Sequence, residues 1–293
     1  MGYFQIKVET HPIVLLSILM VATAITMARI NIENSIDYIN DKNTLFLVFV
    51  RYLLLPIIFI LALYFSILEL NQIMATIILF LSAPTAIIAL TISRSVGGFI
   101  MPTLSFTILA SIVSLIPFTL AMSLFFNNNA FFVFYICFFV TGMSLLIPYL
   151  FILQARKIKP IKTAKMGERY AFLSIILISI FIILVSMSLE PISLVKLLIA
   201  TAIAIGLRVI AVIFSLNSHI NSLDTYISMS YPNIFLIIVI AAMMGHSLVE
   251  EIAILFLLPM FLLSIFDNWY SKFFYIKTSD TRLHTILNIQ EEI

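Results

Sequence analysis

The chain has 293 residues, of which 62% are hydrophobic and 10% are charged, and its mean hydropathy is +1.18. A soluble domain contains about 45–50% apolar and about 25% charged residues, so the apolar excess here must face lipid. One cysteine excludes a disulfide framework, and four scattered histidines form no zinc or iron–sulfur pattern. The net charge of +2 does not indicate nucleic-acid binding. We expect an all-α protein of the lipid bilayer, with no cofactor, metal or nucleic-acid partner.

Nine stretches are long and apolar enough to cross a bilayer, which takes about 20 residues at about 1.5 Å of helical rise each. They are continuously apolar, which favours helices over the alternating strands of a barrel. No small-residue cleavage pattern follows the polar start, so the first stretch is expected to stay in the mature protein. A polar segment at 30–44 is predicted to be an interfacial connector. The nine stretches are 12–29, 45–67, 71–95, 100–126, 131–154, 170–189, 193–216, 222–245 and 249–272.

Orientation follows from the predicted loop at 155–169, which carries six basic residues against Glu168 alone. Short loops rich in Lys and Arg stay in the cytoplasm, so this loop is expected there; binding of lipid or nucleotide is the alternative reading. Nine crossings then put the N-terminus outside and the tail 273–293 in the cytoplasm. A short, loop-poor chain suits a bacterial inner membrane.

Two stretches carry a proline beside small polar residues near their middle. A single such proline is most simply an ordinary kink. Two of them at corresponding places indicate helices that break inside the bundle, because freed backbone groups are tolerated in lipid only when they line a cavity or are buried in protein. This pattern is typical of inverted-repeat secondary transporters. We predict one transporter domain over 1–293 with repeats at 12–126 and 131–272, and breaks at Pro84, Thr85, Ser228, Ser230, Pro232 and Asn233.

Two arginines lie inside predicted crossings. Arg51 either extends to the interface or faces the bundle interior, and Arg208 lies deeper in its stretch. Carboxylates are missing from the middle of the stretches, apart from what Asp224 supplies near the start of the eighth. Apart from Asp224, we therefore expect no carboxylate at the membrane midplane, where proton relays and sodium sites usually rely on one.

The chain resembles the bile acid:sodium symporter family, a superfamily relative of the auxin efflux carriers. In these families a helix interrupted at proline precedes a glycine-containing turn and a Ser/Thr-rich helix, and an Asn follows the second break. The resemblance implies a core domain with two crossing broken helices, from stretches two, three, four, seven, eight and nine, and a panel domain from stretches one, five and six. The runs that carry it are RYLLLPIIF (51–59), SAPTAIIALTISRSVGGFIMPTLSFTILASIVSLIPFTL (82–120) and YPNIFLIIVIAAMMGHSLVEEIAI (231–254).

The chain departs from that family at its sodium sites. The family's sodium-binding Gln falls on Arg51, and its buried Glu falls on Ser228. Thr107 and Ser111 keep hydroxyls where the family's first sodium site has them, although small hydroxyl residues also serve close helix packing. The resemblance therefore implies a divergent member with degenerate sodium sites, in which Arg51 supplies the missing positive charge.

The sequence favours a secondary-active transporter that moves a small organic solute, an organic anion, by alternating access. The candidate coupling ions are Na⁺ and H⁺, and sodium coupling is expected to be absent or altered. Alternatives are a sodium-independent exporter or facilitator of the auxin-carrier type, and a membrane receptor or assembly protein that keeps the fold. An enzyme is not expected, because the chain has no nucleophile–base pattern, no HExxH and no P-loop. The predicted substrate-binding residues are Arg51, Pro84, Thr85, Arg208, Ser230, Pro232 and Asn233, and the ion-binding ones Thr107, Ser111 and Ser228.

Overall fold

A computed structural model of the chain describes residues 11–30, 39, 41–65, 72–126, 128–186, 193–216 and 222–267. Within these ranges the protein is helical, with turns and one isolated backbone bridge but no strand. Four described helices are long and apolar enough to cross a membrane, or up to six if each of two bent pairs is one crossing. The fold is therefore that of a helical integral membrane protein, and the predicted count of nine crossings stays a prediction.

All nine predicted stretches fall on a helix or a succession of helices. The predicted connector at 30–44 falls largely, and the predicted tail at 273–293 wholly, outside the described residues. The helices are α1 (Pro12–Ala28), α3 (Lys42–Phe49), η1 (Val50–Leu54), α4 (Leu55–Phe65), α5 (Gln72–Ser82), α6 (Ile88–Ser95), α7 (Ile100–Val113), α8 (Leu115–Phe125), α9 (Ala130–Thr141), η2 (Gly142–Leu146), α10 (Ile147–Ile158), α11 (Pro160–Arg169), α12 (Ala171–Ser186), α13 (Leu194–Leu216), α14 (Ser222–Ser230), α15 (Ile234–Met244) and the last helix, Ser247–Asp267.

Short polar side chains begin several of these helices. The Asp41 carboxylate accepts the Thr44 N–H at 2.8 Å at the start of α3, and Asn129 and Asn233 cap α9 and α15 in the same manner. Gly245 ends α15 with a φ of +74°, a left-handed conformation that glycine adopts without steric cost.

Two π-helical turns, η1 and η2, precede Pro56 and Pro148. A proline inside a helix removes one N–H and clashes with the carbonyl four residues earlier, and a π-turn relieves both by widening the helix. The helices therefore accommodate both prolines by a π-turn. In η1 the turn holds Arg51 and Tyr52, and both side chains are buried.

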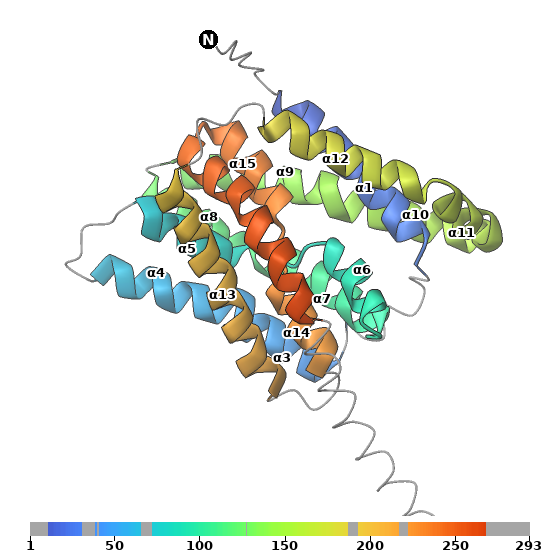
Figure 1. The fold of residues 1–293 in the computed structure, drawn as a ribbon, viewed down its shortest axis with the longest axis horizontal. Coiled ribbons are helices and arrows are strands. Elements are labelled where there is room, and N and C mark those ends of the chain that lie inside the picture. Colours follow the sequence, from blue (N-terminus) through green and yellow to red (C-terminus); the bar gives the residue numbers. More distant parts are fainter. Residues whose placement is uncertain are drawn as a thin grey trace, which may run out of the picture.

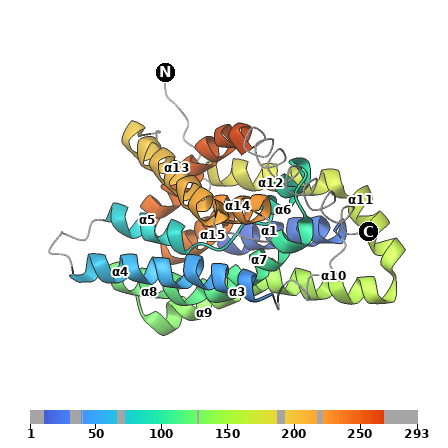
Figure 2. The ribbon, with the colours of Figure 1, turned by 90° about the horizontal axis from the view of Figure 1, so that it is seen from below.

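The helices pack in two groups. Figure 1 shows α1, α10, α11 and α12 together on one side, and α1 contacts all three as well as η2; these five elements are called the α1 bundle. On the other side α14 packs against α6, α7 and α13, and α3 packs against α7; these five are called the crossing bundle. Helix α15 contacts α1 and α9. Figure 2 shows α14 and α15 near the middle, with α4 and α11 toward opposite ends.

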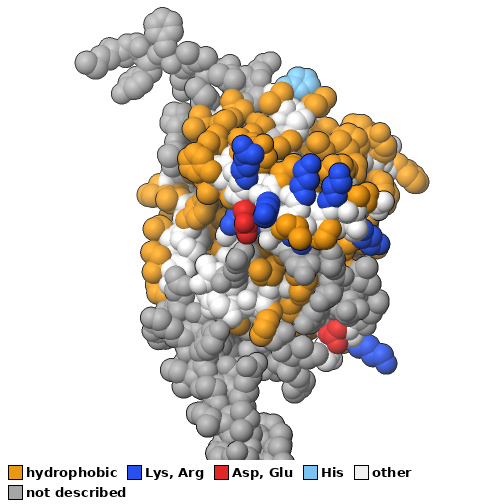
Figure 3. All heavy atoms as spheres, turned by 90° about the vertical axis from the view of Figure 1, so that its right-hand side faces the viewer, with side chains coloured by type: hydrophobic (Ala, Val, Ile, Leu, Met, Phe, Trp, Pro, Cys, Tyr) orange, Lys and Arg blue, Asp and Glu red, His pale blue; other side chains and the backbone are white. Residues whose placement is uncertain are grey.

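Residues 155–169 were predicted to form a loop, but they belong to two helices, so the predicted loop structure is wrong. Helix α10 continues to Ile158, and α11 starts at Pro160, a residue whose fixed φ suits the first turn of a helix. The basic residues lie on these two helices, and Figure 3 shows Lys and Arg side chains gathered at that end of the molecule among hydrophobic ones. The pattern of charge is as predicted, but on a helical scaffold.

Gly167 of α11 lies directly against the end of α1. A Cβ at this position would be 2.6 Å from the backbone carbon of Ala28 and 2.7 Å from the backbone nitrogen of Arg29, distances that force the two helices apart. We expect Gly167→Ala to cost about 1–3 kcal/mol, measured as a lower melting temperature in detergent. Gly206→Ala in α13 is the matched control, because a Cβ there meets nothing within 4 Å; equal losses in both variants would contradict this packing.

Candidate functional site

The two predicted breaks exist, and they contact one another. Helix α5 ends at Ser82 and α6 begins at Ile88, while α14 ends at Ser230 and α15 begins at Ile234. The backbone N–H of Asn233 donates to the carbonyl of Pro84 at 2.6 Å, and that of Ala86 donates to the carbonyl of Tyr231 at 2.8 Å. Thr85 and Pro232 thereby form an antiparallel bridge. The breaks are full interruptions instead of kinks, and each satisfies backbone groups that the other has freed.

Side chains satisfy carbonyls in the last turns of the two half-helices. The carbonyl of Ser228, in α14, accepts from the Thr85 hydroxyl at 2.8 Å and from the Tyr52 hydroxyl at 3.1 Å. The two hydroxyls are 2.8 Å apart. The carbonyl of Leu81, in α5, accepts from Nη1 of Arg51 at 2.7 Å. The last four carbonyls of a helix lack intrahelical donors, so these contacts replace the bonds that continuing helices would have made.

Arg51 faces the bundle interior, where its side chain is 1% exposed, so the alternative of extension to the interface is wrong. Its guanidinium lies at the C-terminal end of α5, where the helix dipole favours positive charge. Nε has no hydrogen-bond partner among the described residues. The Arg51 guanidinium is thus held at the first break by the carbonyl of Leu81.

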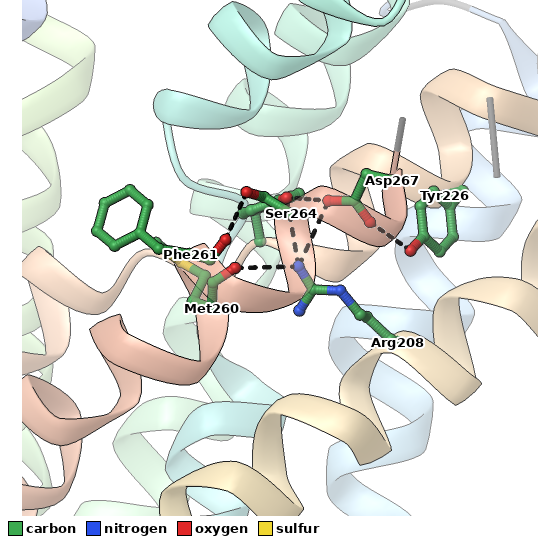
Figure 4. Close-up of polar contacts among 7 residues, drawn as sticks. Arg208, Tyr226, Met260, Phe261, Ser264 and Asp267 are labelled. Carbon is green, nitrogen blue, oxygen red and sulfur yellow. Dashed lines mark hydrogen bonds and ion pairs between the residues drawn. The ribbon is translucent and has the colours of Figure 1, made fainter. Parts of the chain in front are cut away.

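Arg208 belongs to a buried cluster of charged and phenolic groups (Figure 4). Its Nη2 lies 3.4 Å from the carboxylate of Asp267 and 3.3 Å from the hydroxyl of Tyr231. Tyr226 donates to the other carboxylate oxygen at 2.6 Å, and Tyr231 also donates to Asp267. The guanidinium lies 5.1 Å from the centre of the Tyr231 ring. The cluster therefore connects α13 and the last helix to the second break.

Two carboxylates, Asp224 and Asp267, are buried, and neither lies in the middle of a predicted stretch. Asp267 is 0% exposed, although its place near the end of the ninth stretch suggested the membrane surface. Asp224 is also buried, and one of its oxygens accepts from the Ser93 hydroxyl and from the Phe99 N–H, each at 2.8 Å. Asp224 thereby anchors the start of α14 to the turn between α6 and α7.

The predicted ion-binding hydroxyls are all buried. Thr107 and Ser111 donate to backbone carbonyls four residues earlier in α7, at 2.8 and 2.6 Å, and Ser228 donates to the carbonyl of Asp224 at 2.6 Å. Their protons are therefore used within their own helices. In the described part of the chain, no three His, Cys, Asp or Glu side chains are grouped as metal ligands.

A pocket of about 190 Å³ lies between the α1 bundle and the crossing of the breaks. One wall is formed by α1, α12 and Ser144 of η2, and the other by residues 86–91 and the start of α15. Apolar side chains line most of it, with scattered hydroxyls and the amide of Asn233. Arg29, at the end of α1, is the one charged residue among the described residues that line it.

The pocket and the predicted substrate residues overlap only at Asn233. Pro84, Thr85 and Pro232 form the bridge between the breaks, while Arg51, Arg208 and Ser230 are buried beside it. Sequence reasoning missed Tyr52, Tyr226, Asp267 and Arg29. A signal for Asp267 was present, because an arginine as deep as Arg208 requires a buried partner. Arg29 is the last residue of the first stretch and gave no such signal.

Comparison with protein-family models and with curated proteins found no match to the chain.

Proposed function

We propose that the protein is a secondary transporter that carries a small organic solute by alternating access. One observation carries this proposal: the two broken helices cross through backbone hydrogen bonds beside a pocket whose far wall is a separate bundle. A site at the contact of two bodies changes its exposure when one body moves against the other. In this proposal the crossing bundle and the α1 bundle are the two bodies. They correspond to the core and the panel of bile acid:sodium symporters. The proposed protein has nine crossings and is built from inverted repeats.

Sodium-independent transport is the form of this function that the contacts favour. Helix C-terminal ends and unwound carbonyls are the groups that coordinate Na⁺ in broken-helix transporters. Here Arg51 donates to Leu81 of the α5 end, and Thr85 and Tyr52 donate to Ser228 of the α14 end. These groups already occupy carbonyls that a bound ion would need.

Alternating access can be tested before the solute is identified. In a Cys137→Ser background, single cysteines replace Thr26 and Ile178, which line the pocket from α1 and α12. We expect a membrane-impermeant maleimide to label both positions from either face of sealed vesicles, at different rates. Lys162→Cys, exposed on α11, should react from one face only, and Ile237→Cys, buried in α15, from neither.

A fixed receptor or assembly protein predicts a different labelling pattern. Its pocket cysteines would react from a single face, or from none, under every condition. That result, with Lys162→Cys labelled normally, would contradict the transporter proposal.

A further inference from the structure

We propose that the exposed bases of α10 and α11 bind the headgroups of anionic phospholipids at the membrane surface and so anchor the α1 bundle there. The sequence left two readings of this basic run open, a signal of orientation and a binding surface. The proposed function uses neither the bases nor a lipid partner, so a transporter and a receptor would bind lipid here alike. Five exposed side chains, called the basic surface, carry the proposal: Lys157, Lys159, Lys162, Lys165 and Arg169.

The charges of the basic surface have no counter-charge within the described chain. None of the five forms an ion pair or a side-chain hydrogen bond with a described residue. Glu168 is the one acidic residue of α10 and α11. The sixth base of the run, Arg156, is buried and donates to the carbonyl of Ala28, so it holds α10 to α1 instead. An excess of exposed positive charge without internal partners is complementary to an anionic lipid surface.

Helix α11 packs on α1 with one side and presents its bases on another. Gly167 lies against the backbone of Ala28 at the end of α1. Lys162, Lys165 and Arg169 follow one another at i, i+3 and i+7, a spacing that puts them on one face of the helix, and all three are exposed. Helix α11 is also bent by 50° from α12, so it does not continue the line of that apolar helix. The packing thus fixes the three bases as a group at the end of the α1 bundle.

Exposed apolar side chains surround these bases, and they favour a lipid over a soluble acidic partner. Ile158, Ile161 and Met166 are each more than half exposed, and Figure 3 shows Lys and Arg among hydrophobic side chains at this end. The apolar surface continues along the neighbouring helices with Phe151 of α10 and Phe172 of α12. At a bilayer surface such side chains enter the acyl region, while the lysine stems extend their ammonium groups to the phosphates.

The test measures binding of individual lipids to the purified full chain in detergent by native mass spectrometry. The probes are phosphatidylglycerol and phosphatidylcholine with identical acyl chains, so that they differ only in the headgroup. We expect the wild type to prefer phosphatidylglycerol. Lys162→Gln with Lys165→Gln should weaken its binding about 25-fold, about fivefold for each lysine, and leave phosphatidylcholine binding unchanged. Lys162→Arg with Lys165→Arg keeps both charges and should keep the preference.

Lys42→Gln is the matched control for Lys162→Gln alone. It also removes an exposed lysine near the start of a helix, but in α3 of the crossing bundle, outside the basic surface. An equal loss of phosphatidylglycerol affinity in the two variants would overturn the proposal in favour of general charge attraction. Equal binding of the two lipids by the wild type would overturn it as well, and so would an unchanged preference in Lys162→Gln with Lys165→Gln.

Two soluble competitors distinguish a phospholipid from other anionic partners. Glycerol phosphate carries the phosphate without acyl chains, and a polyglutamate peptide stands for an acidic protein. We expect neither to displace phosphatidylglycerol at equal concentration, and displacement by either would overturn the proposal in favour of that partner. Ile161→Gln with Met166→Gln leaves every base in place and should still weaken phosphatidylglycerol binding; unchanged binding would contradict the contribution of the apolar side chains.

Discussion

Replacing Asp267 with alanine is expected to lower the free energy of unfolding by about 3–5 kcal/mol. The substitution leaves Arg208 buried without its counter-charge, and it removes the acceptor of both Tyr226 and Tyr231. The measurement is unfolding of the purified protein in mixed micelles, followed by circular dichroism. Tyr226→Phe, which removes one hydrogen bond to the same carboxylate, should cost less, about 1.5–3 kcal/mol.

The double variant Arg208→Met with Asp267→Leu removes both charges but keeps apolar side chains in their place. It therefore distinguishes the effect of an unpaired charge from the effect of lost packing. Buried pairs replaced by apolar residues of similar volume are often neutral in stability, so we expect the double variant to regain most of the loss. A double variant as unstable as Asp267→Ala would mean that packing at the end of the last helix, instead of the unpaired charge, causes the loss.

The helices were largely predictable from the sequence, because a membrane-spanning helix is marked by the hydrophobicity of its own consecutive residues. Continuous apolar runs marked the described helices other than α11, and proline with polar neighbours marked the breaks at Pro84 and Pro232. The helical state of 155–169 was missed, because a dense basic run was interpreted only as a signal of topology. Charge reports on which side a segment lies, and it does not prevent Lys-rich residues from forming a helix.

The site was less predictable because it depends on pairing between distant segments. The sequence marked Arg51 and Arg208 as unusual, but it could not show that one donates to Leu81 and the other pairs with Asp267. Both arginines make contacts within the protein that the sequence did not reveal. Arg29 was overlooked for the opposite reason. A charged residue at the end of an apolar stretch is typical of the membrane interface, and only the folded chain places Arg29 on a pocket.

Replacing potassium or choline with sodium is expected to leave the melting temperature of the wild type unchanged. In Arg51→Gln, the same replacement should raise the melting temperature. The shorter, neutral side chain leaves the carbonyl of Leu81 without its charged donor, which should cost about 1.5–3 kcal/mol in choline. The freed oxygens at the end of α5 then resemble the unwound helix ends that coordinate Na⁺ in broken-helix transporters. Arg51→Lys retains the charge and should show no response to sodium.

Arg156→Gln distinguishes a site at the crossing from a general effect of uncapped helix ends. Arg156 is also a buried arginine that donates to the last turn of a helix, at Ala28 of α1, but it lies away from both breaks. This variant should lose stability without gaining any response to sodium, because the end of α1 does not lie where the two broken helices cross. A sodium-dependent rise in the wild type would mean instead that an ion site exists beside Arg51. In that case the arginine has not replaced the ion, and sodium coupling would have to be restored to the proposed function.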